Sequence, residues 1–236
     1  MAVGKESFFW HKVHSLTGVI PIGFYMLQHL ALNSFSLAGP EAFNGVIGFF
    51  ASVPKHLLLA LEICVLGIPI LFHAVYGLFI VGRAQPNYFA TTYKWSQNRM
   101  FGLQRWSGVV LFFLLILHVV TTSVNAKING EQVILWQAWH EKLTSYGYSV
   151  LVLYLLGVLA ASYHLAYGIW NFCIRWGITV GERSQIAVQK FAFGFFIGVT
   201  LLGWSALYGF LREPGLSEVH VEMSFQAPAS IEPASP

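Results

Sequence analysis

The residues of this sequence best suited to chemistry are four histidines, one in each of the first four long apolar segments: His29, His73, His118 and His164. Ionisable side chains inside a membrane are costly and usually functional, and neutral imidazole is a good metal ligand. The segments that carry these histidines also repeat. TGV at 17–19 precedes His29, and SGV at 107–109 precedes His118. HAVYG begins at His73, and HLAYG begins at His164. We therefore expect the four histidines to work as one set.

The composition predicts that these segments cross a membrane. Of the 236 residues, 56% are hydrophobic and 10% charged, and the mean hydropathy of +0.62 leaves too little polar surface for a water-soluble globule. Five apolar stretches are long enough to cross a hydrocarbon core of about 30 Å. The predicted fold class is an all-α membrane protein, a bundle of five transmembrane helices at about 15–37, 57–82, 106–126, 148–174 and 191–211.

The distribution of basic residues predicts the orientation of the bundle. Short cytoplasmic loops retain Lys and Arg. Nine of the thirteen basic residues lie on the side that holds the N-terminus, which we therefore expect to be cytoplasmic, with the C-terminus external. Residues 1–212 form the predicted membrane domain, and 213–236, acidic and rich in Pro, Ser and Ala, a flexible external tail. The first apolar stretch lacks a cleavage pattern and should remain as the first helix.

Two other classes of function are disfavoured. No soluble segment combines a basic tract with interleaved aromatic residues, so nucleic acid is not an expected partner. The two cysteines, Cys64 and Cys173, lie in different apolar segments without CxxC or CxxCH spacing. Neither a structural disulfide nor covalent haem attachment is therefore expected.

The positions of the four histidines along their helices predict two pairs. His29 and His118 lie about 14 and 13 residues from the inner ends of outgoing helices, which places both in the outer half of the membrane. His73 and His164 lie about 9 or 10 residues from the inner ends of returning helices, in the inner half. Each pair shares a depth.

Two imidazoles at one depth on separate helices are what a six-coordinate haem requires, because the porphyrin supplies the other four ligands. An iron saturated in this way favours electron transfer over oxygen chemistry. Buried histidines also form hydrogen bonds between helices or relay protons, and for a single residue that alternative stays open. Gly77 and Gly168, each four residues after a histidine, remove side-chain bulk on the same face, either where a macrocycle would lie or where two helices pack closely. Gly18 and Gly108 precede His29 and His118 by eleven and ten residues and could do the same one level deeper.

Several segments in order resemble the dihaem, five-helix cytochrome b anchor of succinate dehydrogenase. They are HSLTGVIPIGFYMLQHL at 14–30, EAFN at 41–44, LFHAVYGLFI at 71–80, LQRWSGV at 103–109 and WGITVGERSQ at 176–185. The resemblance covers about residues 5–212 and excludes the tail.

The resemblance implies a multi-pass subunit of a bacterial cytoplasmic-membrane succinate:quinone oxidoreductase, bound to a flavoprotein and an iron–sulfur protein. The four histidines would ligate two haems b, paired as above, and the quinone, commonly menaquinone in this family, would react near the outer haem. Residues at the positions of His14, Ser15 and Arg175 would neighbour the propionates of the inner haem.

One departure bears on the direction of the reaction. Related fumarate reductases carry a glutamate two residues before the fourth ligand, proposed as a proton path, and here that residue is Ser162. The departure favours succinate oxidation over fumarate reduction, which remains the alternative on this scaffold.

Quinone reduction needs protons, and the polar candidates near the outer end are Gln28, Asn33, Glu62 and His140. A rival from another class is a haemless transporter or structural anchor. A third possibility is an unrelated dihaem cytochrome, such as the anchor of a hydrogenase or formate dehydrogenase.

Overall fold

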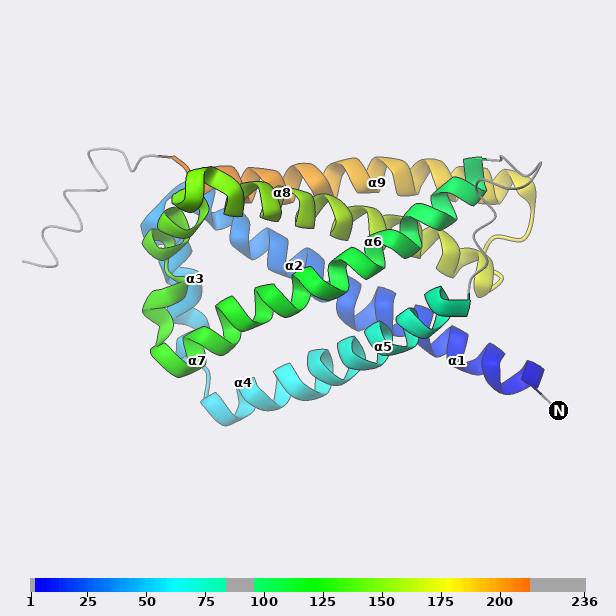
Figure 1. The fold of residues 1–236 in the computed structure, drawn as a ribbon, viewed down its shortest axis with the longest axis horizontal. Coiled ribbons are helices and arrows are strands. Elements are labelled where there is room, and N and C mark those ends of the chain that lie inside the picture. Colours follow the sequence, from blue (N-terminus) through cyan, green and yellow to red (C-terminus); the bar gives the residue numbers. More distant parts are fainter. Residues whose placement is uncertain (1–2, 84–95, 213–236) are drawn as a thin grey trace, which may run out of the picture.

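The computed structural model describes residues 3–83 and 96–212, and every regular element within those ranges is helical (Figure 1). The α-helices are α1 (Val3–Thr17), α2 (Phe24–Asn33), α3 (Pro40–Ser52), α4 (Lys55–Leu61), α5 (Ile68–Arg83), α6 (Ser96–Val119), α7 (Asn125–Asn129), α8 (Trp136–Arg175) and α9 (Glu182–Gly209). The predicted tail at 213–236 lies outside the described residues.

Five of the helical stretches are long and apolar enough to cross a membrane, which confirms the predicted all-α class with five candidate spans. They are Phe8–Ala38, Lys55–Arg83, Asn98–Asn129, Trp136–Arg175 and Glu182–Gly209. Helices suit this setting because they satisfy every backbone polar group within the segment, where lipid offers no partner.

The five stretches form an elongated bundle in which α8 packs against α6 and α9, α1 against α5, and α2 against α9 (Figure 1). The start of α1 and the end of α9 lie at opposite ends of this bundle. We call the end that holds the start of α1, Arg83 and Arg175 the inner end. The end that holds α3, α7 and Arg212 is the outer end.

Three of the spanning stretches contain a wider, π-helical turn. The first, Gly18–Gly23, includes Pro21, and the second, Glu62–Gly67, ends just before Pro69. The third is Val120–Val124. Proline lacks an N–H group and crowds the carbonyl four residues back, so a wider turn accommodates it without ending the helix.

Large apolar side chains cover the outside of the bundle. Phe24 is 70% exposed and Phe113 is 65% exposed. Such a surface is unfavourable in water but is what contact with lipid chains requires.

The outer end has the largest buried cluster of the described residues: Phe43, Trp136, Trp139, Leu143, Leu207 and Phe210. Asn44, beside Phe43 on α3, accepts a hydrogen bond at its Oδ1 from the backbone N–H of Trp136, at 2.9 Å. Since Trp136 is the first residue of α8, Asn44 caps that helix from a different part of the chain.

Helix α8 is interrupted near the outer end. The backbone leaves helical geometry from Ser145 to Tyr148, with positive φ values of 50° at Tyr146 and 64° at Tyr148. The interruption separates a short outer segment, 136–144, from the spanning segment that carries His164.

Candidate functional site

The structure brings the four histidines together as two pairs. His29 on α2 faces His118 on α6, with ring centres 5.8 Å apart and ring planes at 80°. His73 on α5 faces His164 on α8, with ring centres 6.1 Å apart and planes at 89°. These are the pairs that the depth argument expects, and haem ligation by them stays a prediction.

Both separations fit a metal ion held between the two rings. A first-row metal lies about 2.0 Å from each imidazole nitrogen, and the centre of the ring lies roughly 1 Å beyond that nitrogen. Two imidazoles on opposite sides of one metal would therefore have ring centres about 6 Å apart. In the described part of the chain, no hydrogen bond joins the two rings of either pair. The same part contains no group of three or more His, Cys, Asp or Glu side chains placed to hold a metal ion. A site with two protein ligands suits a metal whose other ligands come from a cofactor.

The inner pair is fixed in one tautomer by backbone carbonyl groups. Nδ1 of His73 donates a hydrogen bond to the carbonyl of His14, and Nδ1 of His164 donates one to the carbonyl of Gln104, both at 2.9 Å. Because a carbonyl only accepts, Nδ1 must carry the proton in each ring. This leaves the lone pair on Nε2, the usual arrangement of a metal-binding histidine.

Side chains contact the ring nitrogens of the outer pair, as the Ser107 hydroxyl does at Nδ1 of His164, 3.3 Å away. Nδ1 of His118 lies 3.3 Å from the hydroxyl of Tyr154 on α8. The amide nitrogen of Asn33 lies 3.3 Å from Nε2 of His29 and donates to the His29 carbonyl at 2.8 Å. Asn33, one of the four quinone candidates, is therefore directly beside an outer-pair histidine.

The three predicted propionate neighbours gather at the inner end, next to the inner pair. The ring of His14 stacks on that of His73, with centres 4.0 Å apart and planes at 6°, and its Nε2 is buried without a hydrogen-bond partner. Ser15 accepts a hydrogen bond from Nε1 of Trp176 at 3.1 Å, and Arg175 donates to the carbonyl of His11 at 3.4 Å. This part of the bundle thus offers an imidazole nitrogen, a hydroxyl and a guanidinium group, all suited to a carboxylate.

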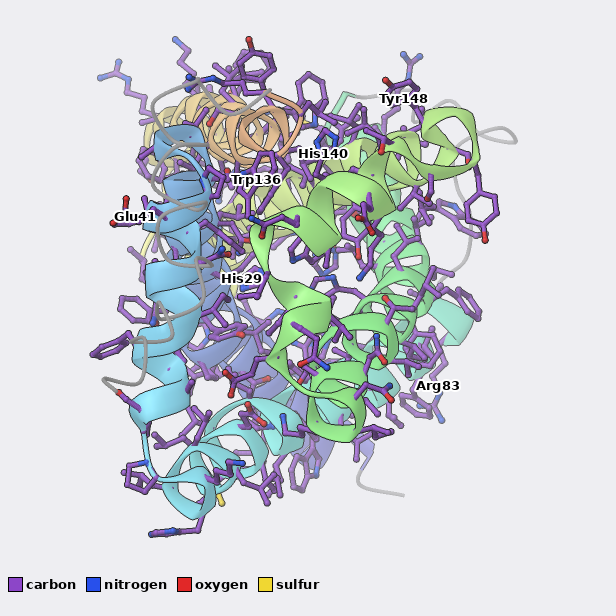
Figure 2. All side chains as sticks on the ribbon, turned by 90° about the vertical axis from the view of Figure 1, so that its left-hand side faces the viewer. His29, Glu41, Arg83, Trp136, His140 and Tyr148 are labelled. Carbon is purple, nitrogen blue, oxygen red and sulfur yellow. The ribbon has the colours of Figure 1, made fainter. Side chains whose placement is uncertain are left out.

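The remaining quinone candidates do not form one site. Glu62 forms an ion pair with Lys127, with 2.6 Å between Oε2 and Nζ. His140 donates from Nδ1 to the carbonyl of Phe210 at 2.8 Å and stacks on Trp136, so it is part of the outer-end packing. Gln28 is exposed on the side of the bundle. Figure 2 views the molecule from the outer end, with His29, Trp136 and His140 labelled.

The glycines after the inner histidines have close neighbours on the adjacent helix. A Cβ atom added to Gly77 would lie 3.1 Å from Nε2 of His14, and one added to Gly168 would lie 4.0 Å from the side-chain nitrogen of Gln104. Gly18 and Gly108 face the rings of His73 and His164, not those of the histidines on their own helices.

Two residues beside the outer pair were missed by the sequence analysis. Lys142, half-buried, donates from Nζ to the carbonyl of Thr121 at 3.2 Å and lies 4.5 Å from the ring centre of Trp139. Tyr154 is the partner of His118. In the sequence, Lys142 is only one of the four basic residues on the outer side, and Tyr154 resembles any other aromatic residue of an apolar span. No signal in the sequence separates either from its neighbours.

Comparison with known proteins places the chain in a family. The family model described as succinate dehydrogenase/fumarate reductase transmembrane subunit matches residues 85–207. The chain is also 35% identical over 208 residues to the succinate dehydrogenase cytochrome b558 subunit of Bacillus subtilis (strain 168), covering 88% of this chain and 99% of that protein. The chain belongs to this transmembrane subunit family. The resemblance predicted from the sequence motifs is thereby confirmed, and the five candidate spans agree with a transmembrane subunit.

Proposed function

We propose that this chain is the cytochrome b subunit of a succinate dehydrogenase, which carries electrons from an iron–sulfur subunit through two haems b to a quinone. The observation that carries the proposal is the separation of the histidine rings, 5.8 Å in one pair and 6.1 Å in the other. Haem b, when bound, supplies reversible one-electron chemistry between ferric and ferrous iron. The related b558 subunit is itself named as a cytochrome.

The geometry supports a proposed set of residues for each haem. His73 and His164 would ligate the inner iron. His14, stacked on His73, together with Ser15 and Arg175 at the same end of the bundle, would bind its carboxylates. His29 and His118 would ligate the outer iron. Lys142 would bind a propionate there, because its ammonium group lies beside Thr121, one turn beyond His118, and no carboxylate of the described residues pairs with it.

The quinone would react near the outer pair. Glu62 and Asn33 are the supported candidates for proton delivery, since Asn33 touches His29 and Glu62 places a carboxylate at the outer end. His140 is less suited, because its Nδ1 is already engaged with Phe210. Menaquinone is the proposed substrate, by resemblance to the family.

The proposed setting is a bacterial cytoplasmic membrane, with the inner end facing the cytoplasm and binding the iron–sulfur and flavoprotein subunits. The excess of Lys and Arg on that side supports the orientation. Succinate would be oxidised in those partner subunits and not by this chain. Ser162 is fully buried and stands where related fumarate reductases carry a glutamate. Because a serine supplies no carboxylate at that position, succinate oxidation is favoured over fumarate reduction.

The proposal is tested by replacing each histidine with alanine and titrating the haems in the purified complex. His73→Ala and His164→Ala should each remove the same haem signal, and His29→Ala and His118→Ala should each remove the other. His56→Ala serves as control, because His56 is exposed and lies outside the proposed pairs. A colourless wild-type protein would instead support the haemless anchor, and signals lost in other combinations would overturn the pairing.

A further inference from the structure

The first span and α5 fit together through a reciprocal contact between a histidine and a glycine on each of them. His14 and Gly18 are one turn apart on the first span, and His73 and Gly77 are one turn apart on α5. Because the helices run in opposite directions, His14 lies against Gly77 while His73 lies against Gly18. A methyl group at Gly18 would overlap Cε1 of His73 and lie 2.9 Å from its Nδ1.

Helices α6 and α8 repeat the contact. Gln104 and Gly108 on α6 take the places of His14 and Gly18, and His164 and Gly168 on α8 take those of His73 and Gly77. A methyl group at Gly108 would lie 2.7 Å from Cε1 of His164. The two helix pairs therefore build the same recess for an imidazole, although their remaining side chains differ.

A hydroxyl group completes each recess. The carbonyl of His14, which accepts from His73, also accepts from the hydroxyl of Thr17 at 3.0 Å. The carbonyl of Gln104, which accepts from His164, also accepts from the hydroxyl of Ser107 at 2.8 Å. In both cases the residue before the glycine shares the carbonyl that orients the ring.

We propose that Gly18, Gly108, Thr17 and Ser107 are positioning residues for the inner haem. The glycines leave room for the rings of both of its histidines in one plane, and the two hydroxyls moderate the hydrogen bonds by which the His14 and Gln104 carbonyls orient those rings. The inference rests on the proposed function. Gly18 and Gly108 would thus serve a haem whose ligands come from other helices. Gly18 shares a span with His29 and Gly108 shares α6 with His118, and both of these histidines belong to the outer pair.

Among the glycines that the structure describes, none lies against the ring of His29 or His118. Besides each other, these two rings contact the side chains of Asn33, Tyr25 and Tyr154. A side chain adjusts more easily than a helix backbone. We therefore expect changes at the recesses to act on one haem alone.

The decisive experiment compares Gly18→Ala and Gly108→Ala in the purified complex, measuring haem per polypeptide, the potential of each haem and the low-spin EPR signals. Both variants should lose or shift the haem that His73→Ala removes, and both should retain the other haem unchanged. A change in the haem that His29→Ala removes, or no change in either, would overturn the inference.

Two control variants separate positioning from crowding. Gly198→Ala adds a methyl group where nothing lies within 4 Å, and Gly203→Ala adds one against Val158. Neither should shift the inner haem selectively. A selective shift in either control would show that the inner haem responds to any strain in the bundle, and would overturn the assignment.

Milder variants keep the inference testable if the alanine variants fail to assemble. Thr17→Val keeps the shape and removes only the hydroxyl, so the His14 carbonyl accepts more strongly from His73 and the ligand becomes more electron-rich. The potential of the inner haem should fall while that of the outer haem stays the same. An unchanged inner potential in both Thr17→Val and Ser107→Ala would overturn the role of the hydroxyls. Loss of the haem pairing in the histidine series would contradict the proposed function itself, so the two failures are distinguishable.

Discussion

The imidazole planes of His73 and His164 cross at 89° with their ring centres 6.1 Å apart, and those of His29 and His118 cross at 80°. With planes near a right angle, neither π-type d orbital of a ferric iron held between them would be favoured over the other. We expect both proposed haems to give highly anisotropic low-spin EPR signals. Signals typical of parallel imidazoles would contradict the ring orientations.

A second prediction concerns Glu62. The side chain of Glu62 is 34% exposed and that of its ion-pair partner Lys127 is 46% exposed, so breaking the pair should cost under about 1 kcal/mol of stability. If the carboxylate delivers protons, Glu62→Gln should lower quinone reduction by roughly 10²-fold while haem content stays normal. Lys127→Gln is the matched control, because it breaks the same pair but keeps the carboxylate. Equal losses in both variants would indicate that the pair matters only for structure.

Lys142 should affect the outer haem selectively. A nearby positive charge favours the reduced iron, so Lys142→Gln should lower the midpoint potential of the outer haem in a redox titration. The inner haem should titrate as in the wild type. Lys127→Gln removes another outer-side charge that is already neutralised by Glu62, and its effect should be smaller. An unchanged outer potential in Lys142→Gln would remove this residue from the proposed propionate site.

The outer end should depend on Asn44. Asn44→Ala removes the acceptor for the N–H of Trp136 and should lower the free energy of unfolding by about 1 kcal/mol, as loss of a helix cap usually does. Thermal unfolding of the purified complex measures the change. Asn44→Asp keeps an oxygen acceptor and should be closer to the wild type, whereas equal destabilisation by both variants would contradict the capping role.

The spans and the two histidine pairs could be predicted from the sequence because both depend on local properties. Hydropathy locates a helix in a membrane, and a rise of about 1.5 Å per residue fixes the depth of His29 or His164 along it. Neither calculation requires knowledge of which helices are neighbours.

The recesses could not be predicted because they depend on that knowledge. The repeated glycines were visible, but the sequence does not reveal that Gly18 faces His73 on another helix. The buried cluster around Phe43 and Trp136 was missed for a similar reason, since short helices between spans carry a weak pattern. The family motif EAFN included Phe43 and Asn44, but their contacts with α8 and α9 appear only in three dimensions.

The π turn at Gly18–Gly23 reconciles a difference between the two repeats. Eleven residues separate Gly18 from His29, but only ten separate Gly108 from His118 along an unbroken α6. A π turn absorbs one surplus residue, whereas an ordinary helix would carry it forward as a rotation of about 100°. Deleting one residue between 19 and 22 would therefore keep His29 in phase if a regular turn formed. The same deletion between 109 and 117 would swing His118 away from its partner.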